Sequence, residues 1–206
     1  MAQQVLPTKA NLINTKKSLE LAKLGYELMD RKRNILVREM MLLIDEAKEI
    51  QKTVSAVYEE AYDSLKKAYI TLGSCEGFAR SIPVDNSLNV DYRSVMGVEL
   101  PIVSVAENRN GVFYGFQNTN SMLDEAYLKF GEVKKLTARL AETESSVYRL
   151  ADAIRKTQKR ANALEHILIP QFESTVKFIS DALEEKERED FSRLKVTKKQ
   201  KESVKK

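Results

Sequence analysis

The chain has 206 residues, 31% of them charged and 7% aromatic, with a net charge of +4 and a single cysteine. One cysteine excludes an internal disulfide, and no stretch approaches the roughly 20 apolar residues that a membrane span needs. Seven Gly and four Pro among so many charged residues favour long solvent-exposed helices, in a cytoplasmic protein that does not insert into the membrane.

The first predicted element is a helix from about Thr8, which has the side chain of an N-cap, to about Leu72. Its apolar residues keep an unbroken 3-4 spacing from Leu19 to Ala61, and Arg33 is the single exception. This spacing predicts a seam that winds left-handed around a partner helix. The seam residues that we single out are Leu19, Leu36, Met40, Leu43, Ile50, Val54 and Val57.

Two features mark the end of this helix. Leu65, Ala68 and Leu72 continue the apolar face one residue out of register, which predicts a local change in supercoiling. Gly73 and Gly77 are then expected to close the helix.

Residues 78–117 have a different character, with two prolines and β-branched runs. They predict one short β-hairpin, which Pro101 restricts to the edge of a sheet because proline donates no ladder hydrogen bond. A polar cluster follows at residues 118–121. There, Ser121 and Asp124 resemble a capping box that begins the next helix.

The second long helix is predicted over residues 120–192. Pro170 is expected to loosen or kink it, because proline removes one backbone hydrogen bond. Beyond Phe191 the lysine-rich chain is expected to fray. The seam residues of this helix are Leu136, Leu140, Val147, Leu150, Ile154, Leu164 and Leu168.

Together these elements predict an all-α-dominated fold with a long antiparallel two-helix coiled coil. Its segments are residues 1–77, 78–117 and 118–206. The two termini are expected to lie together at one end of a long rod, and the middle region with its short β-hairpin is expected to cap the other end.

Residues suited to catalysis are sparse. Gly73 and Gly77 are not followed by the Lys-Ser/Thr of a phosphate-binding loop, so they indicate a helix terminus. His166 is the only histidine, and a metal site or a Ser-His-Asp triad would depend on it alone. A position on the coil surface explains His166 better, and Cys75 is expected to be structural. The sequence therefore predicts no catalytic, metal or cofactor site and no independent enzyme.

Basic residues are dense near the start of the first helix and in the second half of the second helix. An antiparallel hairpin places both groups in the same half. One interpretation is nucleic-acid binding, which the lack of aromatic residues between the lysines disfavours. The other is docking into an acidic protein sleeve. For Arg33, on the seam, a further interpretation is that it fixes the register of the helices.

Four stretches carry a resemblance to a known family: Pro7-Thr8-Lys9, Met96-Gly97-Val98, the run from Lys159 to Glu165, and Ile169-Pro170. With them the chain resembles the D subunit, the central-shaft protein of the V-type and A-type rotary ATPases, over nearly its whole length. The resemblance implies a non-catalytic rotor subunit that couples ATP hydrolysis or synthesis to rotation of a membrane ring and to proton or sodium transport. The alternative, from a different class, is a free-standing cytoplasmic coiled-coil tether or adaptor.

The resemblance also implies partners and a place at the membrane periphery. The paired termini are expected inside a hexamer of A and B subunits. The opposite end is expected to bind the F subunit and a funnel-like subunit above the membrane ring, and no nucleic acid is implied. The expected hexamer contacts are Lys9, Lys16, Lys32, Arg33, Arg155, Lys159, Arg160, Arg188 and Arg193. The expected contacts with the F subunit, chosen around aromatic residues off the seam register, are Tyr62, Lys66, Tyr69, Tyr127 and Phe130.

Overall fold

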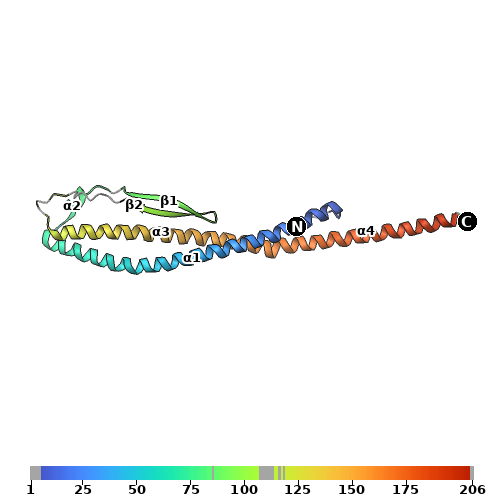
Figure 1. Cartoon of the computed structure of the whole chain (residues 1–206), viewed down its shortest axis with the longest axis horizontal. Helices are drawn as coiled ribbons and strands as arrows, with labels where there is room; N and C mark the ends of the chain where they lie inside the picture. The colour runs from blue at the N-terminus through green and yellow to red at the C-terminus, as the bar shows by residue number, and fades with distance from the viewer. Residues whose placement is uncertain (1–5, 85, 107–113, 116, 118, 205–206) are drawn as a thin grey trace. The chain divides into compact units, whose positions relative to one another are not determined.

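A computed structural model of the chain describes residues 6–84, 86–106, 114–115, 117 and 119–204 (Figure 1). The prediction of a helix-dominated fold with a small β-hairpin in its middle region is confirmed. The elements in chain order are α1 (Lys9–Leu72), α2 (Glu76–Ser81), β1 (Leu88–Val95), β2 (Val98–Val105), α3 (Ser121–Ala163), the π-helical segment η2 (Leu164–Leu168) and α4 (Ile169–Val204).

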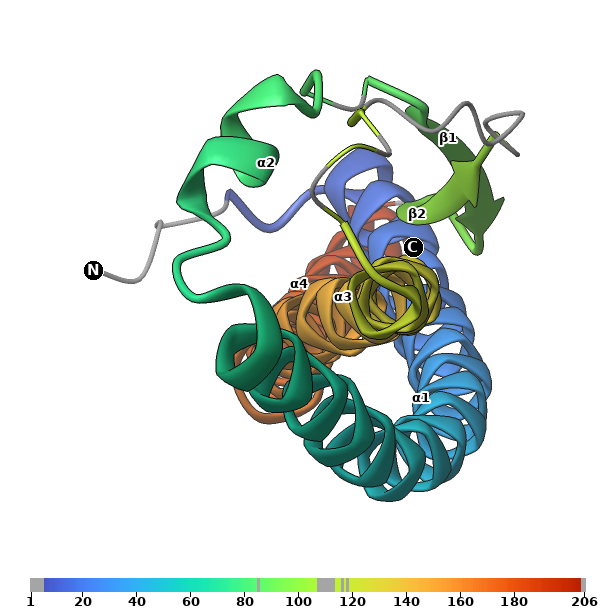
Figure 2. The same cartoon turned by 90° about the vertical axis from the view of Figure 1, so that its left-hand side faces the viewer.

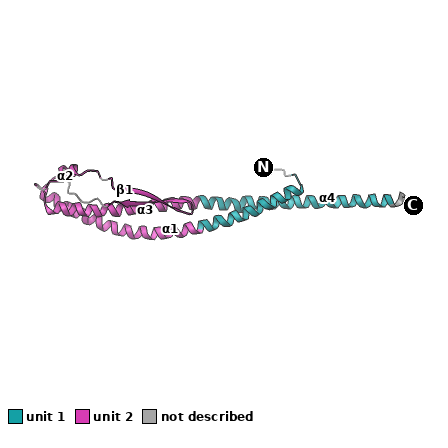
Figure 3. Cartoon of the chain, turned by 45° about the horizontal axis from the view of Figure 1, so that its top comes forward, with its two compact units in different colours: residues 1–33, 156–206 teal, residues 34–155 magenta. Residues whose placement is uncertain are grey.

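The chain forms two compact units (Figure 3). Unit 1 contains residues 1–33 and 156–206, and unit 2 contains residues 34–155. Each unit therefore holds a stretch of both long helical regions, whereas the segments predicted from the sequence follow chain order.

The ends of α1 are set by local chemistry. The N–H of Asn11 donates to the Thr8 hydroxyl at 3.2 Å, so the predicted N-cap is confirmed. At the other end Gly73 has a φ of +75° and its N–H donates to the Tyr69 carbonyl at 3.0 Å. Such a left-handed residue ends a helix. Gly77 was also predicted to close this helix. That prediction is wrong, because Gly77 lies within α2.

In unit 2, α1 and α3 lie side by side and antiparallel (Figures 1 and 2). The Tyr58 and Thr137 hydroxyls are 3.0 Å apart, and the Asn120 amide donates to the Thr71 hydroxyl at 2.7 Å. Along α1, every predicted seam position from residue 19 to residue 61 is buried or half-buried. The apolar 3-4 spacing thus identified the inward side of α1 correctly.

The seam continues in register through Ser64 and Ala68, which are both buried. The Ser64 hydroxyl donates to the Glu60 carbonyl at 3.0 Å and lies 3.4 Å from the Glu125 carboxylate. A hydroxyl satisfied in this way can occupy a buried position. The one-residue shift of the seam predicted at Leu65 is therefore wrong. It was predicted because only apolar residues were counted as seam candidates, which left out Ser64.

β1 and β2 pair antiparallel in continuous register, from Leu88↔Val105 to Val95↔Val98. Met96 and Gly97 form the two-residue turn, and both have a positive φ, 51° and 76°. Two positive φ values are typical of the type I′ turn, whose twist matches that of the strands.

The middle region was predicted to cap the end of the helix pair. Phe78 and Tyr114 of that region do lie there, but its hairpin lies along the helices instead. Leu100 of β2 is fully buried in one cluster with Leu36 and Leu43 of α1 and Leu150 of α3. The strand residues that flank the turn pack against the same cluster. The hairpin therefore buries its apolar end against the middle of the helices, where they offer apolar side chains.

The end of the helix pair is covered by the segment around α2. Cys75 and Tyr114 are buried together with Ala68 and Leu123, and Phe78 of α2 packs against them. We call this group the cap cluster. Cys75 has the structural position that the sequence predicted.

The cap cluster gives a test by pH. The Tyr114 hydroxyl donates to Asp124 Oδ1 at 2.6 Å. Burial, and then this bond to a carboxylate, raises the pKa of the Tyr114 phenol above its ordinary value. An unfolded tyrosine ionises near pH ~10. The stability that Tyr114 contributes is therefore present below about pH 10 and is lost as the pH rises above it.

We expect Tyr114→Phe to lower the free energy of unfolding by about 1–2 kcal/mol at pH 7, because the hydrogen bond is lost. The variant should then lose less stability than the wild-type chain when the pH is raised from about 9 to 11. Urea denaturation at a series of pH values measures both quantities. Parallel pH profiles for the two chains would contradict the assignment.

The start of α3 corrects one prediction. Asn120, rather than Ser121, is the N-cap, because its side-chain oxygen accepts the N–H of Leu123 at 3.1 Å. Asp124, predicted to share a capping box with Ser121, instead accepts the Tyr114 hydroxyl. The predicted capping box is therefore wrong, although the helix begins where the polar cluster placed it.

In unit 1, the first part of α1 runs antiparallel to the segment that begins at residue 156. Lys9 Nζ lies 2.9 Å from the Glu187 carboxylate, and Arg33 donates to the Gln158 side chain at 2.8 Å. The start of α1 thus lies beside α4, as an antiparallel pair requires.

The π-helical segment η2 joins α3 to α4. The N–H of Ile169 donates to the carbonyl of Leu164, five residues earlier. A π turn winds one extra residue into the helix. The next half-buried seam position after Leu164 is therefore Ile169, five residues later, instead of residue 168. Leu168 was predicted on the seam, but it is 38% exposed, and the extra residue is the reason. The loosened turn expected from Pro170 lies directly before it.

α4 extends to Val204, so the fraying predicted beyond Phe191 is wrong. Its side chains are exposed from residue 184 to residue 201. Ion pairs one turn apart support this stretch: Arg188 with Glu184 and Arg193 with Glu189, each at 3.6 Å.

Candidate functional site

Charge is divided unequally between the two units. Residues 1–33 and 156–206 carry 20 Lys and Arg against 12 Asp and Glu, a net charge of +8. Residues 34–155 carry 14 against 18, a net charge of −4. The basic half that the sequence predicted therefore corresponds to unit 1, and an acidic partner would be attracted to it.

The nine predicted hexamer contacts fall into two groups. Four have acidic partners within the chain: Lys9 with Glu187, Arg33 with Asp30, Arg188 with Glu184, and Arg193 with Glu189. The other five have no ion pair in the part of the chain that the structure describes: Lys16, Lys32, Arg155, Lys159 and Arg160. Of the nine predicted contacts, these five are the ones without an internal ion pair to compete with a partner, and Lys32 among them is half-buried. Arg33 is half-buried and contacts Gln158, which suits the fixing of register.

A row of exposed leucines on α1 was missed by the sequence analysis. Leu21, Leu24 and Leu28 are 69%, 54% and 64% exposed. Spacings of three and four residues place them on one face of the helix, and Lys17 and Arg31 continue that spacing at either end. Single exposed leucines are common, but a contiguous row is typical of an interaction surface. We call these five residues the leucine row.

His166 of η2 is exposed, and its Nε2 lies 3.7 Å from the Glu165 carboxylate. Glu165 also reaches Tyr26 of α1, and its negative charge is the main cause that raises the pKa of the Tyr26 phenol. The single histidine therefore has the surface position that the sequence predicted.

The predicted contacts with the F subunit lie on α1 and α3 of unit 2. Tyr62 is half exposed, and its ring meets the Phe130 ring edge-on with centroids 5.6 Å apart. Tyr69 is similarly exposed, and Lys66 pairs with Asp63 at 2.8 Å. These side chains are accessible to a partner.

Tyr127, the remaining predicted contact, has a different environment. It packs against the cap cluster, where its ring meets the Tyr114 ring at 5.8 Å. Replacing Tyr127 would disturb the fold of unit 2 as well as any contact with a partner. Tyr62, Lys66 and Tyr69 are therefore the better residues for testing a partner surface.

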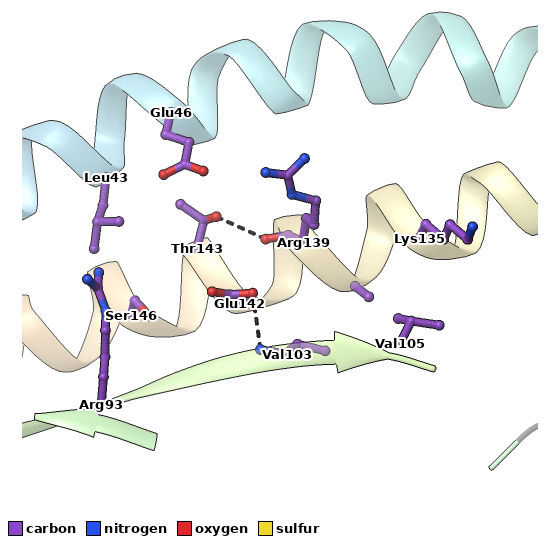
Figure 4. Close-up of a pocket in the computed structure, with 11 residues that line it drawn as sticks. Leu43, Glu46, Arg93, Val103, Val105, Lys135, Arg139, Glu142, Thr143 and Ser146 are labelled. Carbon is purple, nitrogen blue, oxygen red and sulfur yellow. Dashed lines mark hydrogen bonds between the residues drawn. The ribbon is translucent and has the colours of Figure 1, made fainter. Parts of the chain in front are cut away.

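Unit 2 also has a pocket of about 330 Å³ between α1, α3 and the hairpin (Figure 4). The pocket is lined by the cations Arg93, Lys135 and Arg139 and by the carboxylates Glu46 and Glu142. Arg93 pairs with Glu39 at 3.4 Å. The Glu142 carboxylate accepts a hydrogen bond from the N–H of Val103 at 3.1 Å. Two hydroxyl side chains also line the pocket, those of Ser146 and of Thr143, and the Thr143 hydroxyl donates to the Arg139 carbonyl at 2.9 Å.

Comparison with known proteins identifies the family. A sequence profile that describes the D subunit of ATP synthase matches residues 11–199. The chain belongs to the ATP synthase D-subunit family. The V-type ATP synthase D subunit of Thermotoga neapolitana is 46% identical over 193 residues, which are 93% of this chain and 95% of the relative. The A-type ATP synthase D subunit of Pyrococcus horikoshii is 37% identical over 200 residues, 95% of this chain and 94% of the relative.

The resemblance found in the sequence is thus confirmed. Among the described residues, no helix of this member of the D-subunit family is long and apolar enough to cross a bilayer. Within the same residues, no three His, Cys, Asp or Glu side chains gather as a metal site. The exposed surfaces of this family member include four cations without an internal ion pair in unit 1 (Lys16, Lys32, Lys159 and Arg160), the leucine row of unit 1, and aromatic side chains of unit 2.

Proposed function

We propose that the chain is the non-catalytic central-stalk rotor subunit of a V/A-type ATPase. It couples ATP hydrolysis or synthesis in a hexamer of A and B subunits to rotation of a membrane ring and to proton or sodium transport. It acts in the cytoplasm, at the periphery of the membrane. The observation that carries this proposal is the family match over residues 11–199, with relatives named as the D subunits of V-type and A-type ATP synthases.

Unit 1 is the part proposed to enter the hexamer. Its net charge of +8 suits a bore lined by carboxylates, and the leucine row suits an apolar collar within that bore. Contacts of a rotating shaft must break and re-form at each step. Exposed ion pairs are worth roughly 0–1 kcal/mol each, so many modest contacts serve rotation better than a few strong ones.

Unit 2 is the part proposed to bind the F subunit, with the funnel-like subunit above the membrane ring as a further partner. Its exposed aromatic side chains support this proposal, because Tyr is enriched where proteins bind one another. Tyr62 and Tyr69 lie seven residues apart on α1, on a face shared with Lys66.

Native mass spectrometry of this chain co-produced with the A and B subunits of the same source tests the proposal. We expect one copy of the chain per hexamer and an ATPase activity that differs from that of the hexamer alone. A folded, helical chain that does not associate would instead favour the free-standing tether.

Charge reversal tests the surface of unit 1. We expect Lys159→Glu combined with Arg160→Glu to weaken assembly with the hexamer by about tenfold or more, since two attractive contacts become repulsive. Neither cation has an ion pair within the described part of the chain, so no internal bond is broken. The fraction of hexamers that carry the chain measures the effect.

Arg38→Glu combined with Lys52→Glu is the matched control, because both cations are exposed and neither has an ion pair among the described residues. It makes the same change of charge on an exposed face of α1 in unit 2. This control should assemble like the wild-type chain. If both double variants weakened assembly equally, the cause would be the net charge of the chain rather than the unit 1 surface. If neither changed assembly, Lys159 and Arg160 would not belong to the contact with the hexamer.

A further inference from the structure

The pocket between α1, α3 and the hairpin contains a buried hydroxyl that the fold itself does not use (Figure 4). Ser146 is 3% exposed, and its side chain lines the pocket. Within the described part of the chain its hydroxyl has no hydrogen bond, although buried polar groups normally have one. Thr143, on the same wall, is satisfied by the carbonyl of Arg139. The Ser146 hydroxyl is therefore available to a molecule inside the pocket.

Two opposite charges face each other in the same pocket. Glu46 of α1 and Arg139 of α3 point toward one another across the space between the two helices (Figure 4). Neither side chain forms an ion pair among the residues that the structure describes. The pocket thus presents a carboxylate and a guanidinium, next to each other, to the molecule that occupies it.

The charges of the lining decide which class of ligand the pocket can take. A simple cation would meet three cations there, and a simple anion would meet two carboxylates. An α-amino acid avoids both conflicts, because its ammonium and carboxylate groups lie on one carbon and can face Glu46 and Arg139 together. Three cations and two carboxylates leave one positive charge in excess. A ligand with one negative charge in excess, an acidic amino acid, balances it.

One end of the pocket suits a second carboxylate. Ser146 and the guanidinium of Arg93 lie at the same end of the pocket (Figure 4). Arg93 pairs with Glu39 at 3.4 Å, but a guanidinium has several N–H donors and can serve a second acceptor. Leu43 and Val103 line the pocket with apolar surface for methylene groups. The volume of about 330 Å³ is within the range of small-molecule sites.

We infer that this pocket binds a free acidic amino acid of the size of glutamate. The ammonium group donates to Glu46, and the α-carboxylate accepts from Arg139. The side-chain carboxylate accepts from the Ser146 hydroxyl and from Arg93. A ligand held in this way joins the hairpin to both helices. The inference does not depend on the proposed function, because the chain alone supplies every contact.

Isothermal titration calorimetry of the full chain with L-glutamate tests the inference, and we expect saturable binding of one molecule per chain. Three analogues each lack one charged group of glutamate. Glutarate has no ammonium group, 4-aminobutyrate has no α-carboxylate, and norvaline has a methyl group in place of the side-chain carboxylate. Each analogue should bind about tenfold or more weakly, because it leaves one polar group of the pocket unpaired.

Variants of the lining test where the ligand binds. Ser146→Ala and Arg139→Gln should each weaken glutamate binding by about tenfold, because each removes a donor to a carboxylate. Ser145→Ala and Arg155→Gln are the matched controls, on the same helix but outside the pocket, and should bind like the wild-type chain. Alanine favours a helix more than serine does, so weaker binding by Ser146→Ala would not come from unfolding.

The outcomes that overturn the inference differ from one another. A wild-type chain that does not bind glutamate overturns it outright and leaves Glu46 and Arg139 to pair with each other. Glutarate that binds as tightly as glutamate would show a site for simple anions and overturn the class of ligand. Glutamate binding that Ser146→Ala and Arg139→Gln both retain would overturn the assignment to this pocket.

Discussion

Leu150→Ala is expected to lower the free energy of unfolding by about 3–5 kcal/mol, among the larger effects of a single substitution. Leu150 is fully buried where three elements meet: α1 contributes Leu36 and Leu43, α3 contributes Leu150, and β2 contributes Leu100. Truncation removes apolar contacts and leaves a cavity. Side chains that belong to three separate elements cannot all move inward to fill it.

Urea denaturation followed by circular dichroism measures this loss. Tyr148→Ala is the matched control, two residues away on the same helix and 79% exposed, and it should change stability by no more than about 0.5 kcal/mol. A loss below about 1 kcal/mol for Leu150→Ala would show that the hairpin does not pack on the helices as described.

Deletion of His166 together with Pro170→Ala should leave the stability of unit 1 within about 1 kcal/mol of the wild-type value. η2 holds one residue more than an α-helix of the same number of turns. Without His166, Ile169 follows Leu164 at the α-helical spacing of four, and the seam beyond it keeps its phase. The proline is replaced because an α-helix that runs through it loses about 3 kcal/mol or more.

Deletion of Lys177, again with Pro170→Ala, is the matched control. Lys177 is exposed, but each residue turns an α-helix by about 100°, so the deletion takes the fully buried Ile179 off the seam. The π turn of η2 could become an α turn and so restore the phase beyond the deletion, but Ile169 and Phe172 would then leave the seam instead. Either way we expect a loss of about 3 kcal/mol or more in thermal or urea unfolding. Equal losses for the two deletions would contradict the extra residue assigned to η2.

The parts of the fold that the sequence predicted correctly are those decided by neighbouring residues. Thr8 caps α1 through a bond to a residue three positions later. The 3-4 spacing identified the buried side of α1 because it records which face turns inward. The place of the hairpin could not be predicted in this way, since Leu100 packs on Leu36 and Leu150, which are distant in sequence.

For the candidate surfaces too, contacts between residues distant in sequence could not be predicted. The density of basic residues predicted the positive half of the chain correctly. Which cations are already paired depends on contacts such as that of Lys9 with Glu187, and these appear only in three dimensions. The leucine row was missed because two different sets of apolar residues on α1 follow the same 3-4 spacing. The longer series was taken as the seam, and nothing in the pattern said that Leu21, Leu24 and Leu28 remain outside.

The buried side of the helices is formed largely by small side chains, of which Ser64 and Ala68 were described above. Apart from the small residues that line the pocket of Figure 4, the others buried along it are Ala22, Ala61, Ala126, Thr157 and Ala161. Small residues let helix backbones approach closely and leave little volume between them. Such positions lose little when a side chain is shortened, but an added methylene has no space to occupy. Tolerance along this surface is therefore the reverse of that in a leucine-rich core: enlargement of a side chain, rather than its truncation, forces the helices apart.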